Sequence, residues 1–291
     1  MVKLIPTLTN AAMALPATNF NYQSNKKMKK ILSIVLLATT VLTSCKKDSA
    51  PEYDPNVMAN LSVEFDNVAG SADLQLNTGT YTNAAAESFK VTKLKYYVSN
   101  FKLTNINGSV YTVPQASSYF LIDESNVAAH EAELSIPEGE YKTLSFVLGV
   151  DSLRNTMDVS QRTGVLDVSA AAADMYWSWN SGYIFFKMDG TSPSIPAMGG
   201  VFQYHVGGFG GYSSPQPNNL RTITLDLTPR GTPKVKAAKS TNIHLMVDIL
   251  KALNGSTNMS FATTAMIHSA APGTAIANNY TSMFTHDHTE N

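Results

Sequence analysis

The sequence predicts an all-β fold, a β-sandwich with long loops and minor helical turns. Apolar residues alternate with polar ones along many short segments, as Leu61, Val63 and Phe65 do, which is typical of strands buried on one face. Turn signals such as Asn107-Gly108 separate these segments. No long amphipathic run has the spacing of a helix, so strands dominate the prediction.

The expected strands are rich in β-branched and aromatic residues. After the first, near residues 59–65, they cover residues 89–104, 109–113, 119–123, 141–150, 182–188, 201–206, 220–228 and 241–249. Short helical turns are expected only at residues 170–174 and 247–253. Because no internal repeat divides the chain, we expect a single β domain over residues 58–291.

The N-terminal region predicts export and a lipid anchor. Several lysines precede the apolar residues 31–42, the order found in a secretory signal, and this stretch is too short to span a bilayer as a helix. It ends at Leu42-Thr-Ser-Cys45, where small residues precede the only cysteine, as in the lipobox of bacterial lipoproteins. We therefore predict lipidation of Cys45 and a place in the cell envelope, anchored to the outer membrane with a periplasmic or surface face.

These features divide the N-terminal part of the chain into three segments. Residues 1–27 are polar, add nothing to a signal and are expected to be a mis-annotated extension. Residues 28–45 are the predicted lipoprotein signal peptide. Residues 46–57 are polar, contain two prolines and read as a tether.

Composition and charge narrow the possible partners. With 44% hydrophobic and 15% charged residues, the chain can build a sizeable core. The five lysines of residues 1–44 leave 16 basic against 22 acidic residues in the mature chain, a net charge of −6, which argues against nucleic acid as a partner. With no cysteine beyond Cys45, a soft metal could be bound only by His, Met or a modified side chain.

Residues 174–190 form the most unusual stretch and contain both tryptophans, Trp177 and Trp179. They follow Leu-Gly-Val-Asp-Ser-Leu-Arg-Asn at residues 148–155 and precede Phe-Gln-Tyr-His-Val-Gly-Gly at residues 202–208. In this order the three segments resemble the MbnP-like family of exported proteins associated with copper, and Trp-x-Trp-x-x-Gly-Tyr is their most specific element. The resemblance covers most of residues 59–288, and the Cys-Lys-Lys-Asp start at Cys45 resembles lipoproteins of the Bacteroidetes.

The resemblance implies a copper-binding protein that acts in sequestration or delivery and is not an enzyme. It also implies that a partner di-haem enzyme oxidises a tryptophan to kynurenine. Ring opening leaves an arylamine that can join imidazoles around Cu(I), and Trp177 and Trp179 are the candidates. No histidine follows either of them closely, so the imidazoles must come from elsewhere in the chain.

Four of the six histidines are candidate copper ligands, because neutral imidazole is a common nitrogen ligand for copper. His205 ends a predicted strand before two glycines, and His244 lies on one strand face, where a surface role is the alternative. His286 and His288 flank a carboxylate near the C-terminus, in a segment that is either a metal-binding element or a disordered tail. The copper hypothesis requires these histidines to converge near a tryptophan.

The remaining polar candidates have simpler interpretations. His130 is expected at the surface, and His268 has no sequence neighbour that suggests a role. Asp151 and Asn155 are expected to brace their loop by hydrogen bonds from side chain to backbone.

Two competing functions remain open. In the first, Trp177, Trp179 and Tyr183 are exposed and stack on sugar rings, so the protein is a non-metal binding module for a glycan or another ligand. In the second, weaker one, the protein is a hydrolase with a dispersed site. The sequence contains no Gly-x-Ser-x-Gly, no His-Glu-x-x-His and no phosphate loop, so no catalytic motif supports an enzyme.

Overall fold

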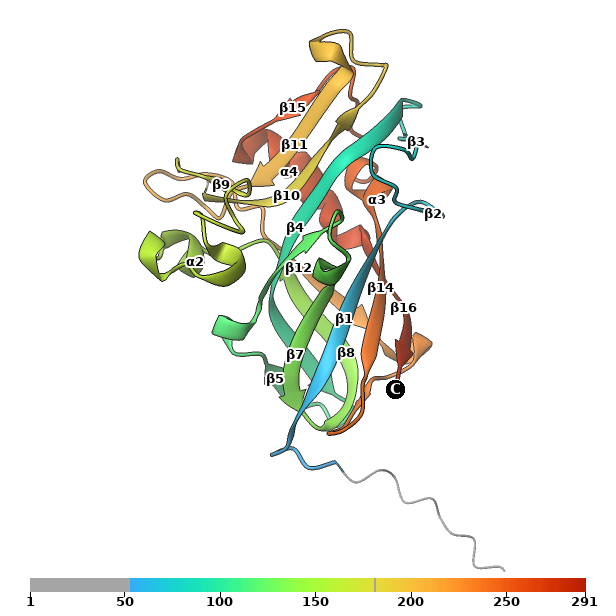
Figure 1. Cartoon of the computed structure of the whole chain (residues 1–291), viewed down its shortest axis with the longest axis vertical. Helices are drawn as coiled ribbons and strands as arrows, with labels where there is room; N and C mark the ends of the chain where they lie inside the picture. The colour runs from blue at the N-terminus through green and yellow to red at the C-terminus, as the bar shows by residue number, and fades with distance from the viewer. Residues whose placement is uncertain (1–52, 181) are drawn as a thin grey trace, which may run out of the picture. The chain divides into compact units, whose positions relative to one another are not determined.

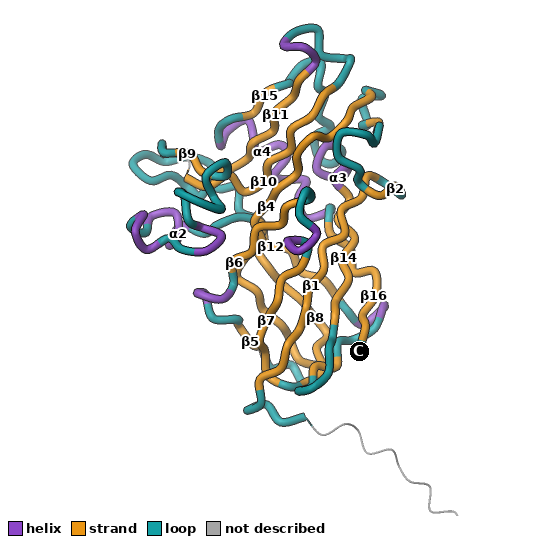
Figure 2. Tube along the Cα trace, viewed as in Figure 1, coloured by secondary structure: helices purple, strands orange, loops and turns teal. Residues whose placement is uncertain are grey.

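Two β-sheets pack face to face in the computed structural model, which describes residues 53–180 and 182–291 (Figures 1 and 2). Strands dominate and helices are few and short, which confirms the all-β prediction. The predicted lipidation site Cys45, the signal peptide and residues 46–52 of the tether lie outside the described residues. Within the described part, no helix is long and apolar enough to cross a membrane.

The smaller sheet joins the two ends of the described chain. Its strands, in spatial order, are β16 (Phe284–Glu290), β14 (Asn242–Asp248), β1 (Met58–Ala69) and β2 (Ala72–Asp73), with β7 (Glu131–Pro137) also paired to β1. β1 and β14 run parallel, with Ser62 opposite Asn242 and Val68 opposite Asp248. β16 pairs antiparallel with β14 and is the edge strand on that side. The first and last strands of the described chain therefore belong to the same sheet.

The larger sheet is built around the longest strand, β4. Its path is β12 (Arg221–Asp226), β8 (Gly139–Leu148), β4 (Ser88–Asn105), β10 (Gly182–Thr191), β11 (Val201–Gly207) and β15 (Met266–Ile267). Short strands extend this path: β3 (Tyr81–Thr82), β5 (Val110–Thr112) and β6 (Tyr119–Asp123) pair with β4, β9 (Tyr176–Trp177) pairs with β10, and β13 (Lys234–Val235) pairs with β8. β15 is parallel to β11.

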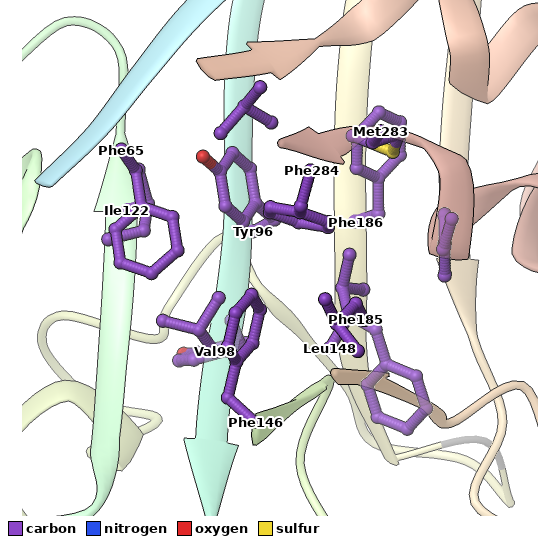
Figure 3. Packing of buried hydrophobic residues seen from close by; sticks show 14 of the residues in the cluster. Phe65, Tyr96, Val98, Ile122, Phe146, Leu148, Phe185, Phe186, Met283 and Phe284 are labelled. Atoms are coloured by element: carbon purple, nitrogen blue, oxygen red, sulfur yellow. The ribbon is translucent and has the colours of Figure 1, made fainter. Parts of the chain in front are cut away.

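An aromatic core joins the two sheets (Figure 3). The ring of Phe65 from β1 lies 5.7 Å from that of Phe146 in β8 and 6.3 Å from that of Tyr96 in β4, both edge to face. Phe284, the first residue of β16, packs on the same three rings. Edge-to-face contact adds to the stabilisation from burying these apolar surfaces, so the core fixes the sheets against each other.

The predicted strands correspond to observed ones, whereas several observed elements were not expected. β7 and β16 went unpredicted, as did the longest helix, α4 (Ala270–Asn279). The helical turn expected at residues 247–253 is α3 (Ile249–Leu253), but residues 170–174 form only successive hydrogen-bonded turns. Just before these turns, the side chain of Asp167 accepts hydrogen bonds from the amide and hydroxyl of Ser169.

Candidate functional site

The two tryptophans form a stacked pair at the edge of the larger sheet. Their ring centroids lie 5.2 Å apart with planes inclined by 22°. Trp177, in β9, is 5% exposed, whereas Trp179 in the following turn is 53% exposed. One ring of the pair therefore belongs to the core and the other faces solvent.

Trp177 packs directly on the backbone of β11. A Cβ atom placed on Gly207 would lie 2.9 Å from Cζ3 of Trp177 and 2.5 Å from the carbonyl oxygen of Tyr183. Only a glycine allows the indole to approach the strand this closely. His205 lies two residues earlier on the same strand, and side chains at such positions share one face. Of the candidate histidines, His205 therefore lies on the strand and face that carry the contact with Trp177.

Asn155 fixes the start of β10, next to the turn that carries the tryptophans. Its side-chain oxygen accepts a 2.9 Å hydrogen bond from the amide of Tyr183, while its side-chain nitrogen donates to the carbonyls of Val150 and Asp151. Asp151 in turn caps α2 (Ser152–Thr156) by accepting from the amide of Arg154. The expected bracing role of Asp151 and Asn155 is confirmed, and it extends to the tryptophan turn.

Asn180 ties a second loop to the same turn. Its side-chain oxygen accepts hydrogen bonds from the amides of Tyr212 and Ser213, and its side-chain nitrogen donates to the carbonyl of Ser214. The exposed rings of Trp179 and Tyr212 line one cleft between these loops. The sugar-stacking alternative expected three exposed rings, but Trp177 and Tyr183 are buried because they pack into the core. Of that platform only Trp179 reaches the surface.

His205 is held by a carboxylate that sequence analysis did not single out. Nε2 of His205 lies 2.7 Å from Oδ1 of Asp189, on the neighbouring strand β10. Because a carboxylate only accepts, Nε2 donates, and in the neutral ring this places the lone pair on Nδ1. Metal-binding histidines are usually held in this way, with a carboxylate that fixes the ring orientation and raises the basicity of the ligand nitrogen.

His268 completes an imidazole pair with His205. The two ring centroids are 4.7 Å apart. Partial burial, and then the nearby charge of His205, lower the pKa of His268 below its usual range, which favours the neutral form that binds metals. Sequence analysis left His268 without a role, because it comes next to His205 only through the parallel pairing of β15 with β11. No local pattern in the sequence signals that pairing.

A partly buried charge cluster is centred on Asp174, which precedes the two tryptophans. Asp174 receives ion pairs from Lys93 at 3.1 Å, and from Lys95 and Lys187 at 3.4 Å. Partial burial alone would raise the pKa of Asp174, but the three lysines, Lys187 foremost, outweigh it and lower the pKa to about 2. Lys187 also donates to the carbonyl of Asp174, so the cluster fixes the chain just before the tryptophan stretch.

The C-terminal histidines point to opposite sides of β16. His288 pairs with His244 across the strands and His286 pairs with Leu245, so Asp287 is an extra residue that forms a β-bulge. The bulge shifts the alternation by one residue: His286 is buried like Phe284, and His288 is exposed. Nε2 of His286 is hydrogen-bonded to the hydroxyl of Thr289 on the same strand.

The four histidines predicted as copper ligands do not converge near a tryptophan, so the arrangement that the copper hypothesis required is wrong for this set: His205 lies on β11 and the other three on β14 and β16. His205 lies on the outer face of the larger sheet, next to Tyr204 and Val206, which face inward. His244 lies on the outer face of the smaller sheet, because its neighbours Ile243 and Leu245 are buried, and His288 is its partner on β16. His205 lies on the same strand face as Gly207, on which Trp177 packs. The C-terminal histidines lie on the smaller sheet, where β16 pairs with β14.

Comparison with known proteins gives one family and one fold. The sequence model of the MbnP family matches residues 58–270. Among solved structures, MbnP from Methylosinus trichosporium is similar, with a TM-score of 0.50 and 18% sequence identity over 75% of this chain and 83% of that chain. No curated protein matches the sequence.

Proposed function

Because the chain belongs to the MbnP family, which is associated with copper, we propose that it binds copper at His205 and His268 beside Trp177. The single observation that carries this proposal is the His205–His268 pair, held by Asp189 on the same strand face that Trp177 covers at Gly207. Imidazole nitrogen is a suitable ligand for copper.

The donor set leaves room for one further ligand from the tryptophan pair. If Trp177 or Trp179 were oxidised to kynurenine, its arylamine would supply a third nitrogen beside the imidazoles. The exposed ring of Trp179 is the part of the pair that a di-haem partner enzyme could approach, and its stacking on Trp177 connects that surface to the buried ring. Both residues therefore remain candidates for the modification.

The protein's role follows from its setting. The expected signal peptide and lipobox at Cys45 would place it in the cell envelope, held at the outer membrane by lipid. There it would sequester or deliver copper without turnover. The ordered hydrogen bonds around the tryptophan turn support such a role, because a pre-arranged site loses little freedom on binding a metal.

The test is metal and mass analysis of the protein isolated from its native host with copper supplied. We expect one copper per chain, lost in His205→Ala and in His268→Ala but kept in the control His130→Ala, whose imidazole lies 3.7 Å from the carboxylate of Glu124. Intact mass and peptide sequencing would locate an oxidised tryptophan at residue 177 or 179. Unchanged copper in both histidine variants would contradict the site. Absence of both copper and modification from the wild-type protein would favour the ligand-binding alternative at Trp179 and Tyr212.

A further inference from the structure

A second group of metal-binding side chains lies on the smaller sheet, at the bulge in β16. His244, Asp287 and His288 each offer one ligand atom, and these atoms lie within 4.8 Å of one another. Within the described residues this is the group of three His, Cys, Asp or Glu side chains arranged closely enough to hold an ion. The bulge creates it, because the extra residue Asp287 sits between the cross-strand partners His244 and His288.

The distances between these ligand atoms suit a metal ion in place of the proton between Asp287 and His288. Oδ2 of Asp287 lies 2.8 Å from Nδ1 of His288 and 3.5 Å from Nδ1 of His244. Two ligand atoms on a tetrahedral zinc ion, each about 2.0–2.1 Å from the metal, are roughly 3.3 Å apart. Small side-chain rotations would therefore bring all three donors into the coordination sphere.

His244 is prepared for this role by its surroundings. Its Nδ1 is buried and makes no hydrogen bond within the described structure. Its other nitrogen, Nε2, faces Asp66 at 3.7 Å and Glu64 at 4.0 Å on β1. A carboxylate behind the distal nitrogen orients a metal-binding imidazole, so Nδ1 is the atom left to bind the ion.

The charge around the group favours a divalent cation. Carboxylates of Glu64, Asp66 and Glu290 surround the two imidazoles and Asp287. The side chain of His288 is 47% exposed and that of His244 is 16% exposed, so an ion can enter from solvent on the side of His288. Nitrogen and carboxylate oxygen without sulfur suit borderline divalent metals and not Cu(I).

We propose that His244, Asp287 and His288 form a second metal site, which binds a borderline divalent cation of the Zn²⁺ class. This site is independent of the copper proposal. It lies on the other sheet, and two of its three ligands come from residues beyond the end of the family match at residue 270. It is therefore a feature of this chain's own C-terminal strand.

The experiment is a calorimetric titration of the chelator-treated protein with Zn²⁺. We expect one Zn²⁺ per chain, with affinity weakened about 10-fold to 100-fold by His288→Ala and by Asp287→Asn. His288 is exposed, so unchanged thermal unfolding would show that the variant is folded. The matched control is His130→Ala, a partly buried histidine beside the carboxylate of Glu124, which should leave the affinity unchanged.

Two outcomes would overturn the proposal. One is Zn²⁺ affinity that is the same in wild type, His288→Ala and Asp287→Asn. The other is an equal loss in the control. A parallel titration of His205→Ala separates the two sites: Zn²⁺ binding should persist there while copper is lost. If His205→Ala kept copper but His288→Ala lost Zn²⁺, the copper site would be wrong and this site correct.

Discussion

Asp189 accepts a 2.7 Å hydrogen bond from Nε2 of His205 across two neighbouring strands. This contact decides which nitrogen of His205 can bind a metal, because it leaves only Nδ1 with a free lone pair. Asp189 is thus a positioning residue for the proposed copper site, and its effect can be measured separately from that of the ligand it holds.

The first prediction concerns this contact. Asp189→Asn keeps the size of the side chain but removes the charge that orients and polarises His205. We expect copper affinity to fall about 10-fold to 100-fold, the usual range for losing such a partner, while His205→Ala abolishes the site. Competition with a Cu(I) chelator measures both. Equal affinity in wild type and Asp189→Asn would show that the carboxylate does not act through His205.

A second prediction uses the contrast between the two tryptophans. Because Trp177 is 5% and Trp179 is 53% exposed, Trp177→Ala should destabilise the fold by about 3–5 kcal/mol and Trp179→Ala by roughly 1 kcal/mol. Urea unfolding measures both. The chain has only these two tryptophans, so iodide should quench the fluorescence of Trp177→Phe strongly and that of Trp179→Phe weakly. Equal quenching would mean that both rings are equally accessible.

A third prediction concerns the close approach at Gly207. In Gly207→Ala the new methyl group meets both the indole of Trp177 and the carbonyl of Tyr183, so Trp177 must shift. We expect a loss of about 1–3 kcal/mol in unfolding free energy and weaker copper binding. Gln203→Ala, on the same face of the same strand, is the control for general damage to the sheet. The idea fails if both variants have the same stability and copper affinity.

A fourth prediction concerns acid stability. The pKa of Asp174 is about 2 in the folded protein, below the ordinary value of 3.8, so the folded state holds the charged form more strongly than the unfolded state does. Its stabilising contribution is complete above about pH 4 and is lost as the pH falls towards about 2. Asp174→Asn should be less stable at neutral pH and should lose less stability over this range. Urea midpoints from pH 2 to pH 7 test it, and parallel curves would refute it.

Much of the fold follows from local pattern, and the strands around the core show why. Residues 59–65 were predicted and fall within β1, because the alternating burial of Leu61, Val63 and Phe65 leaves a visible period in the sequence. β16 left no such mark: its residues after Phe284 are all polar, and the bulge at Asp287 breaks the alternation that would have identified a strand. Its place in the sheet depends on pairing with β14, which local sequence does not encode.

For the candidate site too, some residues could be predicted from the sequence and others could not. His205 and the tryptophans were visible in the sequence, since they lie in one unusual run of segments. Their partners were not, because Asp189 comes from a neighbouring strand and His268 from a parallel pairing that spans more than sixty residues, from Gln203 to Met266. The expectation that His286 and His288 act together was also reasonable from spacing alone, but it did not allow for the bulge.

The parallel pairing of β1 with β14 sets the order in which this protein can fold. Ser62 of the first strand meets Asn242, 180 residues later, so this strand pair cannot form until most of the chain has been made. Contacts this distant in sequence slow folding, because a long loop must close before they form. Until then β1 can pair only with β2 and β7, and the edge that β14 later covers has no partner strand within the described chain.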